Sequence, residues 1–294
     1  MKRIFISIFI LSSLINCSFS QTQNLSIENE LNALSDSIYK LKMGPDSLKK
    51  QISDTIYTKF SEFLTDSSSF YLKFANFKHI GITSAPDNAF RLIQWNYIEK
   101  DGTGKHFGII QFRPGNNGKC LVVKLSETQH EINRDELILK RMSPQQWYGA
   151  LYYKIIPIKN NKTTIYTLLG TRYNSIFTTS KVIETLQIRD DGKIIFGYPI
   201  LNVATKKNVR MIFEYSNKAS MGLKYYDSQK AIVFDHLAPD QPLHTNIYKY
   251  YGPDFTYDAF KMENNSWVFY SNYDFRQPIE EIRKGPKPKI IRSK

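Results

Sequence analysis

Short turn signals divide most of this chain into segments that suit β-strands. Between about residue 70 and residue 270, runs rich in β-branched and aromatic residues alternate with polar pairs or triplets that favour tight turns. Because Asn, Asp and Gly tolerate the backbone conformations that connect antiparallel strands, each such turn predicts a β-hairpin. The five turns are Asp101-Gly102, Asn160-Asn161, Asp191-Gly192, Asp227-Ser228-Gln229 and Asn264-Asn265.

These hairpins predict a mainly β protein of the α+β class, with an antiparallel β domain over residues 67–282. The paired runs are 90–98 with 107–112, 151–158 with 163–169, 182–188 with 194–198, 221–226 with 231–234, and 257–262 with 267–270. We expect a large meander that is curved or folded as a sandwich. The similar spacing of the last four turns leaves a small β-propeller as the alternative, although a blade needs four strands and each interval holds about two. One further helix is expected near Ser143–Tyr148, because Ser143-Pro144 suits a helix start.

A helical hairpin is predicted before the β domain, over residues 21–66. Gly44 can end the first helix, and Asp46 or Ser47 can cap the second. Each helix has a single apolar stripe, so the pair has to pack against its partner helix or the β domain. The apolar residues at helical spacing are Leu31, Leu34, Ile38 and Leu41, then Leu48, Ile52, Ile56, Phe60 and Phe63.

The N-terminus has the layout of a secretory signal peptide over residues 1–20. A basic start is followed by the apolar stretch Ile4–Ile15 and by small residues that favour cleavage after Ser20. The apolar stretch is too short to span a membrane, which takes about 20 residues. We therefore expect a periplasmic or secreted protein. A lipoprotein anchored through Cys17 is the alternative, although Asn16 is larger than the residue that normally precedes a lipidated cysteine.

The formal net charge of +13 does not indicate a nucleic-acid partner. Six of the 40 basic residues lie in the last twelve positions, 283–294, which contain no acidic residue. Without this tail the excess of positive charge is that of an ordinary soluble protein. The tail is predicted to be disordered and could contact anionic surfaces. After export the single remaining cysteine, Cys120, is expected to be buried in a strand.

The sequence carries none of the common catalytic motifs, so no cofactor and no metal are expected. It lacks nucleotide-binding glycine loops, His-Glu-x-x-His, Cys-x-x-Cys and Gly-x-Ser-x-Gly. The first cluster of potentially chemical residues is the strand end Asp235-His236, followed by His244. A carboxylate beside an imidazole is typical of general-base chemistry. However, adjacent strand residues point to opposite faces, so Asp235 can orient His236 only if the strand bends; a histidine bonded to backbone is the alternative.

A second cluster contains Tyr251, Asp254 and Asp258, which follow or flank a Gly-Pro turn. Two carboxylates with aromatic neighbours suit Ca²⁺ or a sugar, but Ca²⁺ requires six to eight oxygens and this segment offers fewer. A turn in which an Asp caps the backbone is the simpler interpretation. If the two segments pair as neighbouring strands, Asp235, His236, Asp254 and Asp258 meet at one sheet edge.

Several stretches resemble an uncharacterised exported protein family of Bacteroidetes-type bacteria. The resemblance covers most of the mature chain and implies export and a single structural unit. That family has no known activity, so it assigns no catalytic residue. The stretches are Ser84–Asp87 through Trp95-Asn96, Lys181–Glu184, Phe196–Pro199, Val233–Leu237 and Tyr251–Asp254 through Asp258–Phe260.

Two functions are consistent with the sequence. The first is a non-enzymatic exported module that binds a protein or glycan of the cell envelope, indicated by the aromatic residues, the β-hairpins and the missing catalytic motifs. The second is a periplasmic hydrolase with His236 as general base and Asp235, Asp254 or Asp258 as the group that orients it or holds a metal.

Overall fold

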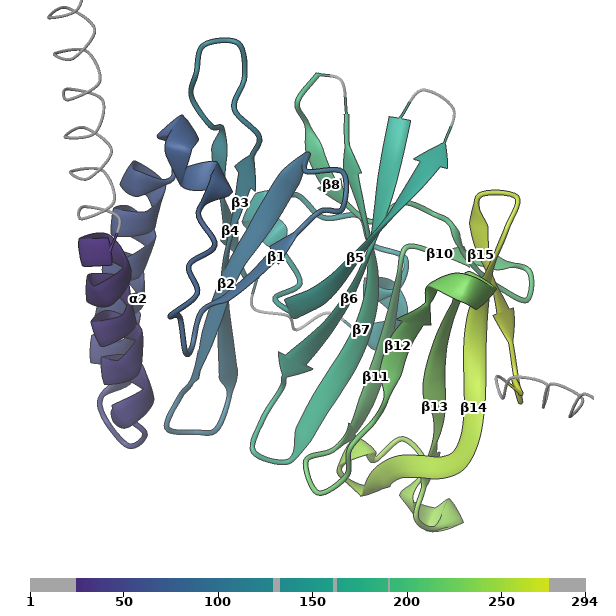
Figure 1. The fold of residues 1–294 in the computed structure, drawn as a ribbon. Coiled ribbons are helices and arrows are strands. Elements are labelled where there is room, and N and C mark those ends of the chain that lie inside the picture. The colour runs from purple at the N-terminus through teal and green to yellow at the C-terminus, as the bar shows by residue number, and fades with distance from the viewer. Residues whose placement is uncertain (1–24, 129–132, 161–162, 190, 275–294) are drawn as a thin grey trace, which may run out of the picture.

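The protein is a row of four layers: a helical pair followed by three sheets stacked face to face (Figure 1). The computed structural model describes residues 25–128, 133–160, 163–189 and 191–274. The proposed export signal and the basic tail lie outside these residues. Within them, no helix combines the length and the apolar character needed to cross a bilayer.

The helical layer consists of residues 25–40 and of α2 (Asp46–Phe63). Leu31, Ile56 and Phe60 are buried in its contact with the first sheet, as the apolar stripes predict. The expected capping is wrong in detail. Pro45 occupies the N-cap of α2, and the Asp46 carboxylate accepts hydrogen bonds from the backbone N–H of Lys100, which ties the helix to the end of a strand.

The first sheet packs the helices on one face and the middle sheet on the other. Its strands lie in the order β1 to β4. Side chains on alternate positions divide between the two faces, so Ile93 and Trp95 contact the helices while Leu92 contacts the middle sheet. Cys120 is buried, as predicted, but it lies just before β4 and not in a strand. The strands are β1 (Gly81–Ser84), β2 (Phe90–Ile98), β3 (Gly104–Phe112) and β4 (Val122–Ser126).

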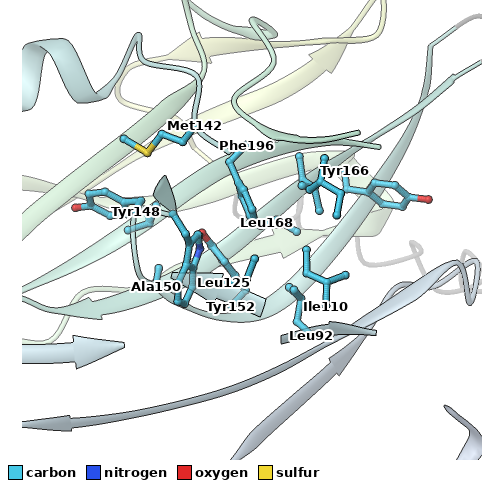
Figure 2. Packing of buried hydrophobic residues seen from close by; sticks show 14 of the residues in the cluster. Leu92, Ile110, Leu125, Met142, Tyr148, Ala150, Tyr152, Tyr166, Leu168 and Phe196 are labelled. Carbon is cyan, nitrogen blue, oxygen red and sulfur yellow. The ribbon is translucent and has the colours of Figure 1, made fainter. Parts of the chain in front are cut away.

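The middle sheet is covered on both faces, so its strands are apolar on both sides. Figure 2 shows Leu168 and Phe196 of this sheet packed towards Leu92 and Ile110 of the first sheet. Each such fully buried side chain contributes about 1.5–3 kcal/mol to the stability of the fold. The order is β11-β7-β6-β5, with β8 also paired to β7. The strands are β5 (Leu151–Asn160), β6 (Thr163–Tyr173), β7 (Thr178–Ile188), β8 (Ile194–Phe196) and β11 (Arg210–Ser216).

The third sheet closes the row and carries the predicted site residues. It packs on the middle sheet through a second apolar core that includes Ile183, Phe234 and Phe260. Its order is β10-β9-β15-β14-β13-β12, and the pair β15 and β9 is parallel. The strands are β9 (Leu201–Val203), β10 (Lys206–Asn208), β12 (Leu223–Tyr226), β13 (Ala231–Pro239), β14 (Tyr251–Glu263) and β15 (Ser266–Tyr270).

The predicted fold class is confirmed, in its sandwich form. All five predicted strand pairs are present, and the helical pair packs against antiparallel sheets. The propeller alternative does not describe the fold, because the sheets differ in size and stack in a row. The helix expected near residues 143–148 is only a 3-10 turn, η2 (Pro144–Gln146). A short helix, α3 (Arg134–Leu137), and the 3-10 helix η1 (Ser67–Tyr71) were not expected.

Candidate functional site

The two clusters singled out in the sequence lie on neighbouring antiparallel strands, β13 and β14. Asp235 pairs with Tyr257 and Leu237 pairs with Pro253, so the single residue His236 faces three residues of β14, Asp254–Thr256. This is a large β-bulge, which bends the strand and changes the direction of the side chains beside it. The bulge brings His236 near the carboxylates of β14, as the pairing hypothesis requires.

Asp258, and not Asp235, is the carboxylate that orients His236. The distance between His236 Nδ1 and Asp258 Oδ2 is 2.8 Å, and the backbone N–H of Asn272 donates to the other oxygen of Asp258 at 3.1 Å. The Asp258 side chain is 7% exposed and that of His236 47% exposed. A buried carboxylate thus holds an exposed imidazole, and within the described residues no hydrogen bond engages the second ring nitrogen, Nε2.

The structure does not bring the Asp235 carboxylate to His236. One Asp235 carboxylate oxygen accepts the backbone N–H of Gly222 at 2.7 Å, so this side chain holds the segment before β12. The physical reason is the alternation of the strand, which places adjacent residues on opposite faces, and the bulge does not reverse it.

Asp254 and Phe255 form the apex of the bulge. Thr256 donates to Asp254 Oδ1 through its backbone N–H at 3.0 Å and its hydroxyl at 2.7 Å. Partial burial raises the pKa of the Asp254 carboxyl, but the bonds from Thr256 and the nearby His236 outweigh it, so the pKa lies below the ordinary 3.8. Phe255 has a positive φ of 69° and is 94% exposed. An aromatic residue in this conformation is uncommon, and such strain concentrates at functional sites.

An open hollow of about 570 Å³ lies beside the bulge, between the β11–β12 loop and the junction of β13 with β14. We call it the β13–β14 hollow. Its walls carry two tyrosine rings, two carboxylates and two ammonium groups. The predicted residues Asp254 and Tyr251 are part of this lining, whereas His236 and Asp258 are not. The polar and aromatic lining side chains are Lys218, Asp240, Lys249, Tyr250, Tyr251 and Asp254.

The rings around the hollow are held in place by neighbours. His244 stacks on Tyr250 with ring centroids 3.9 Å apart, and its Nδ1 lies 2.5 Å from Asp240 Oδ1. The Tyr251 hydroxyl accepts the backbone N–H of Asn246 at 3.0 Å. The predicted residue His244 therefore supports the hollow from behind Tyr250. Rings and polar groups fixed in this way lose little conformational freedom when they bind a ligand.

Four of the six polar and aromatic lining side chains, and the exposed ring beside them, were not predicted from the sequence. Lys218 comes from a loop more than twenty residues away in the chain, and no local pattern connects it to Asp254. Phe255 could have been recognised, because it follows Tyr250 and Tyr251 in a segment rich in aromatic residues. The turn predicted at Gly252-Pro253 is wrong, because both residues lie within β14 and pair with Ala238 and Leu237 of β13. Among the residues that the structure describes, no three His, Cys, Asp or Glu side chains are grouped to hold a metal ion.

Comparison with protein-family models, with curated proteins and with solved structures found no match for this chain.

Proposed function

We propose that the protein is an exported, non-enzymatic binding module and that the β13–β14 hollow, together with Phe255, binds a glycan of the cell envelope. The observation that carries the proposal is the exposed ring of Phe255 on strained backbone, beside an open hollow lined with tyrosines and charged groups. Export rests on the signal-like N-terminus in the sequence.

The chemistry of the hollow suits a sugar. One face of a pyranose ring is a patch of C–H groups that packs on an aromatic ring, and its hydroxyls both donate and accept hydrogen bonds. Tyr251 and Phe255 offer ring surface, whereas the Tyr250 ring is stacked on His244 and has the Lys249 ammonium 5.0 Å from its centroid. Asp240 and Asp254 accept hydrogen bonds, and Lys218 and Lys249 donate them. Bonds to charged groups are about twice as strong as neutral ones.

Glycan binding is tested by titrating the full-length mature protein with soluble envelope polysaccharides and their oligosaccharide fragments. Phe255→Ala removes an exposed ring, and we expect it to weaken binding roughly two- to tenfold, since an aromatic contact is worth about 0.5–1.5 kcal/mol. Tyr71→Ala is the matched control, because Tyr71 is also an exposed aromatic but lies in η1 beside the first sheet.

Asp254→Asn tests the carboxylate, and Asp101→Asn is its matched control. Asp101 accepts the backbone N–H of Thr103 in the same way as Asp254 accepts that of Thr256, but it lies in the β2–β3 turn. We expect Asp254→Asn to lose affinity and Asp101→Asn to retain it. The proposal fails if no glycan is retained, or if the site variants and their controls bind alike.

A hydrolase is the second candidate, because Asp258 orients the exposed His236 and, among the described residues, no hydrogen bond engages the Nε2 of that ring. The geometry argues for binding, since His236 is 47% exposed and is not among the residues that line the hollow, whereas the base of a hydrolase has to face a bound substrate. His236→Ala separates the two functions. We expect this variant to keep glycan affinity, and turnover of an ester, glycoside or phosphoester by the wild type that His236→Ala abolishes would establish the hydrolase instead.

A further inference from the structure

A second recess lies at the opposite end of the row of layers, and nothing in the proposed glycan site depends on it. It forms where the loop between the two helices meets the end of β2, the β2–β3 turn and the β6–β7 turn, which all lie at one edge of the molecule (Figure 1). Its volume is about 530 Å³, within the range of small-molecule sites. We call it the hairpin-tip pocket. Its apolar wall includes Tyr39, Met43, Trp95, Ile98 and Ile176.

The fold brings these segments together through a close backbone approach. Gly102 in the β2–β3 turn has a φ of 85°, and a Cβ added to it would lie 2.1 Å from Ile176 Cγ2. Gly104 approaches the Tyr173 carbonyl oxygen in the same way. Only glycine permits this contact, so the two turns form a continuous wall.

The mouth of the hairpin-tip pocket is apolar although it faces water. Met43 is 80% exposed and Ile176 is 60% exposed, and Tyr39 and Ile98 are also exposed. Contiguous exposed apolar side chains on a soluble protein mark a site that another molecule covers. The floor is buried, because Trp95 and Lys49 are almost inaccessible.

Two lysines beside this apolar wall have no carboxylate partner. Among the described residues, Lys42 and Lys100 form no ion pair, although both line the pocket. The carboxylates nearby are occupied: Asp46 binds the buried Lys49, and Glu99 binds Lys105 at 3.3 Å. Lys49 is itself saturated, since its ammonium also donates to the carbonyl oxygens of Lys42 and Ile98.

We propose that the hairpin-tip pocket binds an anionic amphiphile, a fatty carboxylate whose aliphatic chain lies against the apolar wall and whose carboxylate lies between Lys42 and Lys100. The apolar wall selects the chain. The two ammonium groups select the negative head over a neutral or positive one, since neither has a carboxylate partner among the described residues and Lys42 lies only over the Tyr39 ring, 5.7 Å from its centroid. This assignment is independent of the glycan proposal, because no residue lines both the hairpin-tip pocket and the β13–β14 hollow.

The test is a titration with sodium decanoate below its micellar concentration, followed by calorimetry and by the fluorescence of Trp95. The other two tryptophans, Trp147 and Trp267, are fully buried elsewhere in the fold. We expect saturable binding of decanoate and at least tenfold weaker binding of decyltrimethylammonium, which has the same chain and the opposite charge.

Exposed lysine variants make the result specific. We expect Lys42→Gln and Lys100→Gln each to weaken decanoate binding roughly three- to tenfold. Lys224→Gln, an exposed lysine on β12, should bind as the wild type does, and Met43→Asp should abolish binding. All of these side chains are exposed, so we expect the variants to unfold at the wild-type temperature. The proposal is overturned if decanoate does not saturate, if the cationic amphiphile binds as well, or if both glutamine variants retain full affinity.

Discussion

Replacing Phe255 by glycine is expected to stabilise the protein and, at the same time, to remove glycan binding. The residue has a φ of 69°, a conformation that costs an L-amino acid roughly 1–2 kcal/mol and glycine almost nothing. Because the side chain is 94% exposed, its removal sacrifices almost no buried apolar area. In the folded state, relief of the backbone strain therefore outweighs the contacts that are lost with the ring.

The unfolded state reduces this gain. A glycine has more conformational freedom to lose on folding, which costs about 0.4–1 kcal/mol. The net expectation for Phe255→Gly is a free energy of unfolding higher by about 0.5–1 kcal/mol, or a melting temperature higher by roughly 1–4 °C for a domain of this size. Phe255→Ala is the control, since it removes the ring but keeps the Cβ that causes the strain, and we expect its stability to match the wild type within about 0.5 kcal/mol.

The measurement is urea unfolding of the wild-type protein and both variants, with midpoints compared at equal m-values. A Phe255→Gly variant that is less stable than the wild type by more than about 1 kcal/mol would refute the reasoning, because it would mean that the ring stabilises the bulge. If both variants bind glycan like the wild type, Phe255 is not part of the binding site, whatever its effect on stability.

Two further predictions concern buried charges of the middle layers. Glu184 and Arg210 are both fully inaccessible and paired with each other. We therefore expect Glu184→Gln to lower the free energy of unfolding in urea by about 3–5 kcal/mol, and the double variant Glu184→Leu with Arg210→Met to recover most of that loss. A loss below about 1 kcal/mol for Glu184→Gln would contradict this expectation. Burial lowers the pKa of His106 below 6.5. Burial raises the pKa of Glu127, but the hydrogen bond from His106 and the charge of Arg172 outweigh that effect, so the pKa of Glu127 is lowered overall. In acid the unfolded chain therefore binds protons that the folded protein does not, so stability should fall as the pH drops below about 6.5, and His106→Gln should flatten that slope near pH 6.

The sequence alone determined the hairpins. The signals are local: Asp101-Gly102 and Asp191-Gly192 favour a turn whatever surrounds them, and alternating apolar residues create a face that has to be buried. The burial of Cys120 and the apolar face of α2 followed from the same short-range patterns. The sequence also indicated that β13 and β14 residues could meet at one edge, but not which carboxylate would reach the imidazole.

Only the tertiary structure decided the composition of both sites. Asp258 reaches His236 because it pairs with Phe234, two positions from His236 on the same face of β13, and that register depends on how the whole sheet packs. The hairpin-tip pocket joins Lys42, Lys100 and Ile176, which lie on a helix loop and two different sheets. Their meeting depends on the stacking of the layers, which is set by long-range burial of apolar faces, and no local preference of the chain encodes it.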